Sequence, residues 1–175
     1  MPIYAFQDTQ PRLGARVFLA PSAVVTGDVE VGDDVSFWFH TVARGDMHWI
    51  RIGAGTNIQD GAVLHVTPET HPLRIGAGVV VGHSAVVHGC TIEDHVLVGI
   101  GAHVLDGAVV ESFAQIGAGA VVTPGTRVPS GYLVLGVPAR IARPLTHEEK
   151  QNILDSRDRY VALKDDYRRM LGPGY

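Results

Sequence analysis

The sequence predicts an all-β solenoid, a parallel β-helix of hexapeptide repeats, with a C-terminal α-helix packed along it. Two observations predict this fold. An aliphatic residue recurs at every sixth position over much of the chain, and one long amphipathic segment follows the point where this period stops. A six-residue unit is too long for one strand and too short for a helical repeat, so each unit forms one short side of a coil.

The first half of the chain carries this period with interruptions. The phase breaks near residues 46–51, 66–74 and 88–91, which indicates insertions or a deletion between coils. The aliphatic, aromatic or small residues in register are Leu19, Val25, Val31, Phe37 and Ala43, then Ile52, Ile58 and Leu64, then Ile75, Val81 and Val87.

The second half carries the period without a break. Glycine or an acidic residue often follows the aliphatic position, which suits a corner of the coil. Three sides close one coil of about 18 residues, and stacked coils pair their backbones in parallel, leaving only the two ends as sheet edges. The residues in register are Ile92, Val98, Val104, Val110, Ile116, Val122, Val128 and Val134.

A helix is predicted after the period ends. We therefore divide the chain into a β-helix domain, residues 1–139, and a C-terminal helical segment, residues 140–175. Thr146 and Glu149 have the spacing of a capping box, and Gly172 with Pro173 would end the helix. An apolar stripe is expected to pack along one side of the prism: Ile153, Leu154, Tyr160, Val161, Tyr167, Met170 and Leu171.

Composition excludes several functions. The formal net charge of -4 argues against nucleic acid or an anionic membrane as a partner, because both require a basic surface. A single cysteine, Cys90, allows no intrachain disulfide. The N-terminus lacks the pattern of a signal peptide, and no run of about 18 apolar residues occurs. We expect a soluble, cytoplasmic protein of one ordinary domain.

The stretch from residue 64 to residue 90 contains four of the nine histidines, His65, His71, His83 and His88. His65 and His88 are 23 residues apart, which is one coil plus the excess of the insertion between them. They should therefore stack on adjacent coils at the same edge. Neighbouring strands lie about 4.8 Å apart, so two imidazoles placed in this way can converge on one ion.

His83 lies five residues before His88 and belongs to the preceding corner of the coil. A side of that length spans about 15 Å, far more than the reach of a metal–nitrogen bond of about 2 Å. One chain cannot bring all three histidines to one metal. A threefold oligomer can, if the His83 corner of one subunit faces the His65 and His88 edge of its neighbour.

Polar residues accompany the histidines. Gln59 and Asp60 lie one hexapeptide before His65, where they could serve only as a corner or could hold and deprotonate a water molecule beside a metal. Arg44 and Asp46 lie on a turn, where they could cap a corner or pair across a subunit boundary; we favour the second.

The motifs "RGD", "NIQDGAVLH" and "VGHSAVVHGCTI", followed by "GYLVLGVPAR" and a helix, resemble the γ-class carbonic anhydrases of the hexapeptide-repeat superfamily. The resemblance covers nearly the whole chain. It implies a left-handed β-helix, a homotrimer, and Zn²⁺ at each of three interfaces, where Fe²⁺ or Co²⁺ could replace the zinc. It also implies that His65 and His88 come from one subunit and His83 from the next.

The same resemblance implies a lyase that converts CO₂ and water to bicarbonate, using hydroxide on the metal as the nucleophile. Arg44 and Asp46 match the intersubunit pair of the family, Gln59 and Asp60 match its residues around the metal, and Tyr160 matches a tyrosine near it. Met47 departs from the family, whose best-studied members have an acidic residue there. They also carry a longer acidic loop for proton export, for which Glu69 or His71 could substitute, and low activity would follow if neither does.

Two other functions fit the same fold. A hexapeptide acyltransferase or acyl-CoA thioesterase would need one histidine as general base and no metal. A non-catalytic trimeric assembly protein could use the metal structurally, although a closed structural zinc site would need a fourth ligand.

Overall fold

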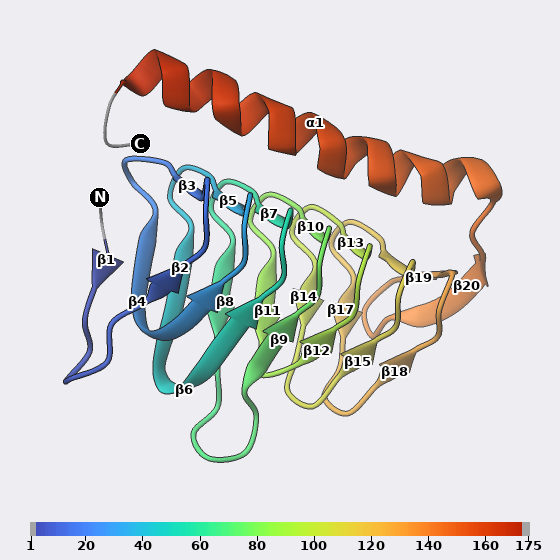
Figure 1. Cartoon of the computed structure of the whole chain (residues 1–175). Helices are drawn as coiled ribbons and strands as arrows, with labels where there is room; N and C mark the ends of the chain where they lie inside the picture. The colour runs from blue at the N-terminus through green and yellow to red at the C-terminus, as the bar shows by residue number, and fades with distance from the viewer. Residues whose placement is uncertain (1–2, 173–175) are drawn as a thin grey trace.

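The chain winds into a parallel β-solenoid of about seven turns, and a single α-helix lies along its side (Figure 1). A computed structural model describes residues 3–172. The solenoid and the helix confirm the fold class predicted from the hexapeptide period. Pro173, predicted to help end the helix, lies outside the described residues.

Each coil has three sides, so the stacked coils form a prism with three faces. Two long strands, β4 (Val24–Val31) and β6 (Val42–Ile52), bend around a corner and contribute to two faces.

The first face, here called the histidine face, comprises the first halves of β4 and β6 together with β1 (Ile3–Tyr4), β8 (Val63–His65), β11 (Val86–His88), β14 (His103–Val104) and β17 (Val121–Val122).

The second face, the charged face, comprises the second halves of β4 and β6 together with β2 (Arg12–Leu13), β9 (Leu73–Ile75), β12 (Thr91–Ile92), β15 (Val109–Val110) and β18 (Arg127–Val128).

The third face, the helix face, comprises β3 (Phe18–Leu19), β5 (Ser36–Phe37), β7 (Asn57–Ile58), β10 (Val80–Val81), β13 (Leu97–Val98), β16 (Gln115–Ile116) and β19 (Tyr132–Leu135). The antiparallel strand β20 (Arg140–Pro144) closes its end.

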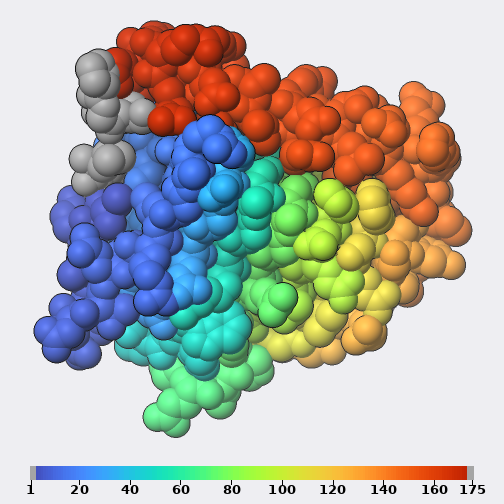
Figure 2. Space-filling model, viewed as in Figure 1, coloured from blue at the N-terminus to red at the C-terminus, as the bar shows by residue number. Residues whose placement is uncertain are grey.

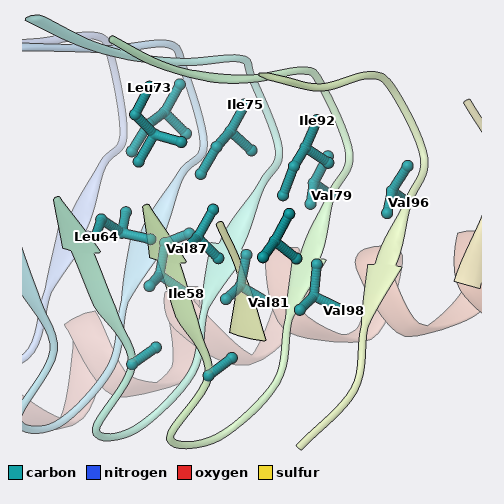
Figure 3. Packing of buried hydrophobic residues seen from close by; sticks show 14 of the residues in the cluster. Ile58, Leu64, Leu73, Ile75, Val79, Val81, Val87, Ile92, Val96 and Val98 are labelled. Atoms are coloured by element: carbon teal, nitrogen blue, oxygen red, sulfur yellow. The ribbon is translucent and has the colours of Figure 1, made fainter. Parts of the chain in front are cut away.

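The predicted inward positions form the core. In Figure 3, Ile58, Val81 and Val98 follow one another from coil to coil, and Leu64 and Val87 form a neighbouring column. All five side chains are fully buried. Burial of such a side chain stabilises the fold by roughly 1.5–3 kcal/mol, so the repeated aliphatic position accounts for much of the cohesion of the prism.

The helix α1 (His147–Leu171) covers the helix face and runs from the last coil back to the first (Figures 1 and 2). Thr146 and Glu149 form the predicted capping box. Ile153 is buried beside Leu133 and Leu145 of the last coil, and Tyr167 packs on Phe18 of the first. The amphipathic segment therefore forms the element expected of it.

The predicted apolar stripe is wrong at two positions. Met170 is 69% exposed, and Lys164 is fully buried instead. The ammonium group of Lys164 is held by the carboxylates of Asp34, 3.0 Å away, and Asp165, 2.8 Å away. Burial of a charged side chain is tolerated because these carboxylates neutralise it, a pairing that hydrophobic periodicity does not reveal.

The outward residues of the three faces differ in kind. The charged face carries arginines and a glutamate, and the helix face carries residues that α1 buries. The histidine face carries an outward column of valines, interrupted by one histidine, which no helix within residues 3–172 covers: Val24, Val42, Val63, Val86, His103 and Val121.

The predicted domain boundary at residues 139 and 140 falls immediately before β20, which continues the helix face by pairing with β19. The division into two segments stays a prediction. Within residues 3–172, no helix combines the length and the apolar character needed to cross a bilayer.

Candidate metal centre

His65 and His88 meet at the edge of the histidine face. They are the last residues of β8 and β11 and are direct partners in the parallel register. Nδ1 of His65 lies 3.0 Å from Nε2 of His88, and the ring centroids are 5.0 Å apart. The structure thus brings together the two histidines whose spacing predicted adjacent coils.

In each ring, the nitrogen that points away from the other histidine contacts an aspartate. Nε2 of His65 lies 3.3 Å from Oδ1 of Asp46, and Nδ1 of His88 lies 2.5 Å from Oδ1 of Asp106. An ionised carboxylate only accepts hydrogen bonds, so these partners assign the proton of each neutral ring to the nitrogen that faces the aspartate. The two nitrogens that face each other are therefore both lone-pair acceptors.

The surroundings lower the pKa of His65 and of Asp46. Burial and the nearby charge of Arg44 lower the pKa of His65, outweighing the hydrogen bond to Asp46. Burial raises the pKa of Asp46, but hydrogen bonds from Arg44 and His65 outweigh it, and the net pKa is lowered. Protonation of His65 is thus disfavoured, and another cation would relieve the facing lone pairs of the two rings.

Arg44 and Asp46 are bonded to each other within one chain. A guanidinium nitrogen of Arg44 lies 2.5 Å from Oδ2 of Asp46, the carboxylate that also contacts His65. Arg44 side-chain exposure is 45%, which leaves it accessible to a second chain. The expected pairing across a subunit boundary stays a prediction.

His83 lies apart from the other two histidines, at the corner that precedes β11. Its Nδ1 is 2.9 Å from Oδ2 of Asp60, and both side chains are 42% exposed. The other oxygen of Asp60 accepts the backbone N–H of Phe39 at 3.2 Å, and its carbonyl accepts the N–H of Ser84 at 2.8 Å. The corner therefore fixes Asp60, and Asp60 holds His83.

Gln59 directly follows β7 on the helix face, and Tyr160 lies on α1, which covers that face. The Gln59 side chain is buried and donates from Nε2 to Oδ1 of Asn57, 3.2 Å away. Tyr160 packs edge-on against Trp38 with ring centroids 5.4 Å apart. Burial raises the pKa of Tyr160, and the negative charge of Asp60 raises it further, so the phenol stays protonated near neutral pH.

The two residues considered for proton export lie in the loop between β8 and β9. Glu69 sits at its tip with a positive φ of 60°, and Nδ1 of His71 lies 2.9 Å from Oγ1 of Thr70. Their role stays a prediction.

Within residues 3–172 of one chain, no group of three or more histidine, cysteine or acidic side chains is arranged to hold a metal ion. His65 and His88 direct two nitrogens at each other, and His83 lies at another corner.

Sequence reasoning missed Asp106, Thr67 and Asn57. Asp106 follows His88 by 18 residues, the length of one coil, so the coil period could have placed it beside His88. Thr67 donates from its hydroxyl to Oδ2 of Asp106 at 2.7 Å, but it lies in the insertion, where the period gives no register. Asn57 lies two residues before Gln59 on β7, so strand alternation could have paired them.

Comparison with known proteins identifies the family. A model of the bacterial transferase hexapeptide, six repeats, matches residues 89–124. The chain is 49% identical to protein YrdA of Escherichia coli, over 93% of this chain and 91% of that protein. It is 38% identical to a carbonic anhydrase of Geobacillus kaustophilus, over 96% and 92% of the two chains.

It is also 46% identical to the mitochondrial gamma carbonic anhydrase 1 of Arabidopsis thaliana, over 89% of this chain and 58% of that protein. The chain belongs to the γ-class carbonic anhydrase family of hexapeptide-repeat proteins. A solved structure of a hexapeptide transferase family protein from Anaplasma phagocytophilum superposes on this family member with a TM-score of 0.91 and 37% identity, covering 95% and 98% of the chains. These matches confirm the left-handed β-helix that the motifs predicted.

Proposed function

We propose that this γ-class family member is a metalloenzyme that reversibly hydrates CO₂ to bicarbonate at metal sites shared between the subunits of a homotrimer. The observation that carries the proposal is the His65 and His88 pair. Each ring is fixed by a carboxylate on its far side, and the two unprotonated nitrogens face each other at 3.0 Å.

The donor set fits a divalent metal. Two nitrogens bound to a tetrahedral zinc at about 2.0–2.1 Å lie roughly 3.3 Å apart, close to the separation of these two nitrogens. Carboxylates behind the rings are typical of histidines that bind metals, because they fix the tautomer and raise the basicity of the ligand. Zn²⁺ is the metal we propose, and Fe²⁺ or Co²⁺ would suit the same nitrogens.

The third ligand in this proposal is His83 of a neighbouring subunit. Its Nδ1 is already bonded to Asp60, so the same carboxylate arrangement recurs at all three histidines. The uncovered valine column supports a second copy as the neighbour. Val63 is 37% exposed in the single chain, and this column lies on the face whose edge carries His65 and His88.

A metal bound there would lower the pKa of a coordinated water molecule towards about 7. The residues of the chain then orient the reactants. Gln59 is held by Asn57 through its amide nitrogen, which leaves its carbonyl oxygen to accept a hydrogen bond from water. Asp60, besides holding His83, supplies a carboxylate that can accept a proton. Tyr160 keeps its proton and can donate it in a hydrogen bond.

Mixed trimers test the shared site. Neither His65→Ala nor His83→Ala alone can complete a three-histidine interface. If the two variants are unfolded and refolded together in equal amounts, about one quarter of interfaces should regain all three ligands, since each half-site is intact in half of the chains. Metal content and CO₂ hydration should rise together on mixing. If neither rises while mixed trimers form, the shared site is refuted.

Acyl transfer is a second candidate, favoured by one observation. His83 and Asp60 form an exposed pair in which the carboxylate orients an imidazole, as a general base requires. Such an enzyme would keep its activity after removal of metal by a chelator. Hydrolysis of an acyl-CoA that survives chelation and disappears in His83→Ala would favour this function over CO₂ hydration.

A non-catalytic assembly role would instead give metal-loaded trimers without either activity.

We place the protein in the cytoplasm, an assignment supported by its single buried cysteine, which forms no disulfide in the described structure.

A further inference from the structure

Asp106 joins His88 to the loop between β8 and β9. One carboxylate oxygen lies 2.5 Å from Nδ1 of His88, and the other accepts the hydroxyl of Thr67 at 2.7 Å. Thr67 opens the loop, and a backbone bridge between Thr67 and His71 closes it, with N···O distances of 3.0 and 3.3 Å. The contacts form a continuous chain from the loop to the imidazole.

We propose that Asp106 is a positioning residue that fixes the tautomer and orientation of His88, and that Thr67 fixes Asp106 in turn. This inference deepens the proposed function, because it names what prepares one ligand. A carboxylate accepts hydrogen bonds from both neighbours, so Nδ1 of His88 must carry the proton. Nε2 is then left with its lone pair directed at His65.

The backbone around Asp106 is shaped to admit this contact. Gly89 follows His88 and has a positive φ of 51°, and a Cβ atom there would collide with Oδ1 of Asp106. Gly107 follows Asp106 with a φ of 68°, and a Cβ atom there would lie 3.2 Å from Nε2 of His71. Both glycines leave room at this corner, for the carboxylate in one case and for the loop in the other.

The two aspartates behind the histidine pair are held differently. Asp46 is bonded to the cationic guanidinium of Arg44, which withdraws negative charge from the contact with His65. Asp106 is bonded to the neutral hydroxyl of Thr67. We therefore assign to Asp106 the stronger effect on the basicity of its histidine, because no guanidinium within residues 3–172 is bonded to it.

The test uses Asp106→Asn in the full-length apo-protein. Asparagine keeps the shape of the side chain but can donate its amide N–H to Nδ1, which would move the His88 proton to Nε2. Nitrogen-15 NMR of the imidazole at about pH 8, where an ordinary histidine is neutral, should show the Nδ1–H tautomer in the parent chain. It should show a shift towards Nε2–H in the variant. Retention of the Nδ1–H tautomer in Asp106→Asn would overturn the proposal.

Metal affinity gives an independent readout. Titration with Co²⁺, and competition for Zn²⁺ with a chelating dye, should show affinity lowered by about 10–100-fold in Asp106→Asn, the usual effect of losing such a partner. Thr67→Val, which keeps the carboxylate, should show a smaller loss in the same direction. If Asp106→Asn does not fold, Thr67→Val still tests the chain of contacts, and unchanged affinity in this variant would refute the proposal that Thr67 fixes Asp106.

Asp94→Asn is the matched control. Asp94 is another corner aspartate, and its side chain accepts the backbone N–H of Ala77 at 2.7 Å. This variant should change neither the His88 tautomer nor the metal affinity, and an equal loss there would make the effect structural. The tautomer is measured without metal. The role of Asp106 can therefore be confirmed even if the protein does not hydrate CO₂, and it can be refuted even if the protein does.

Discussion

The helix face and the histidine face are built from the same repeat but end in different surroundings. On the helix face, α1 buries the outward residues Phe18, Ser36, Asn57 and Val80. On the histidine face, the outward valines remain partly exposed, and Val63 is 37% exposed. The described part of the chain thus covers one apolar face with its own helix and leaves the other partly exposed.

The charged face shows that a bare face need not be apolar. Its outward column includes Arg12, Glu30, Arg51 and Arg74, and Arg51 bonds Glu30 at 2.9 Å. Side chains of this kind keep a solvent-facing sheet compatible with water. An outward column of valines on the histidine face therefore supports the proposed contact with a second copy.

Val63→Asp should have the largest effect on this difference. A carboxylate placed in the valine column would be desolvated without a partner at every subunit contact, at a cost of several kcal/mol each. If the proposed trimer forms through this face, sedimentation velocity should show it replaced by monomer, and the amount of bound metal should fall as well. Thr91→Asp, at an outward position of the charged face, is the control and should leave the assembly intact. A Val63→Asp trimer with full metal content would show that the histidine face is not the contact.

Ile153→Ala should act on the helix face alone. Ile153 is fully buried between α1 and the last coil, so its truncation should lower the free energy of unfolding by about 2–4 kcal/mol. Thermal or urea denaturation measures this loss. Leu163→Ala, at a position of α1 that is 39% exposed, should cost much less. Because α1 lies away from the valine column, the trimer should persist at low temperature, and its loss would argue that the two faces are coupled.

Asp34→Asn should have the smallest effect and should depend on pH. Hydrogen bonds from Arg16, and then from Lys164 of α1, lower the pKa of Asp34 from 3.8 to about 2 in the folded chain. The ionised group therefore stabilises the fold by roughly 2 kcal/mol at most above about pH 4. This contribution is lost as the pH falls through about 2.

Unfolding curves at neutral and acidic pH measure the contribution of Asp34. The difference between Asp34→Asn and the parent chain should shrink as the pH falls below about 4. Asparagine tolerates the positive φ of 57° at this position, so backbone strain should not confound the comparison. Asp158→Asn, which removes a 64% exposed carboxylate from α1, is the control and should show little change. A pH-independent cost in Asp34→Asn would argue against the ion pair as its cause.

Most of the fold could be predicted from the sequence because the inward positions obey one local rule. The period that includes Leu64, Val87 and Val104 places one aliphatic residue on each side of each coil, and burial selects for that residue everywhere. The pairing of His65 with His88 follows from the same rule once the excess of the insertion between them is subtracted, because coil length sets which residues become neighbours.

The remaining features of the fold and the site depend on contacts that the hexapeptide period does not predict. Lys164 is buried because Asp34, 130 positions earlier in the chain, neutralises it, whereas an amphipathic pattern assigns lysine to water. Thr67 reaches Asp106 from an insertion, whose path is set by its own turn rather than by the coil. The position of His83 relative to a neighbouring chain depends on the assembly and lies beyond what one chain determines.

The loop between β8 and β9 departs from the prism at a corner, after His65 has completed its strand, and protrudes from the surface (Figures 1 and 2). Lengthening or shortening it would leave the stacking of β8 on β11 unchanged, since the coil closes again at β9. The scaffold can thus exchange this peripheral segment without rebuilding its interior. Thr67 links this loop to Asp106, and Asp106 contacts His88. A change in the loop could therefore alter the environment of the His88 imidazole, and so its chemistry, without changing the core.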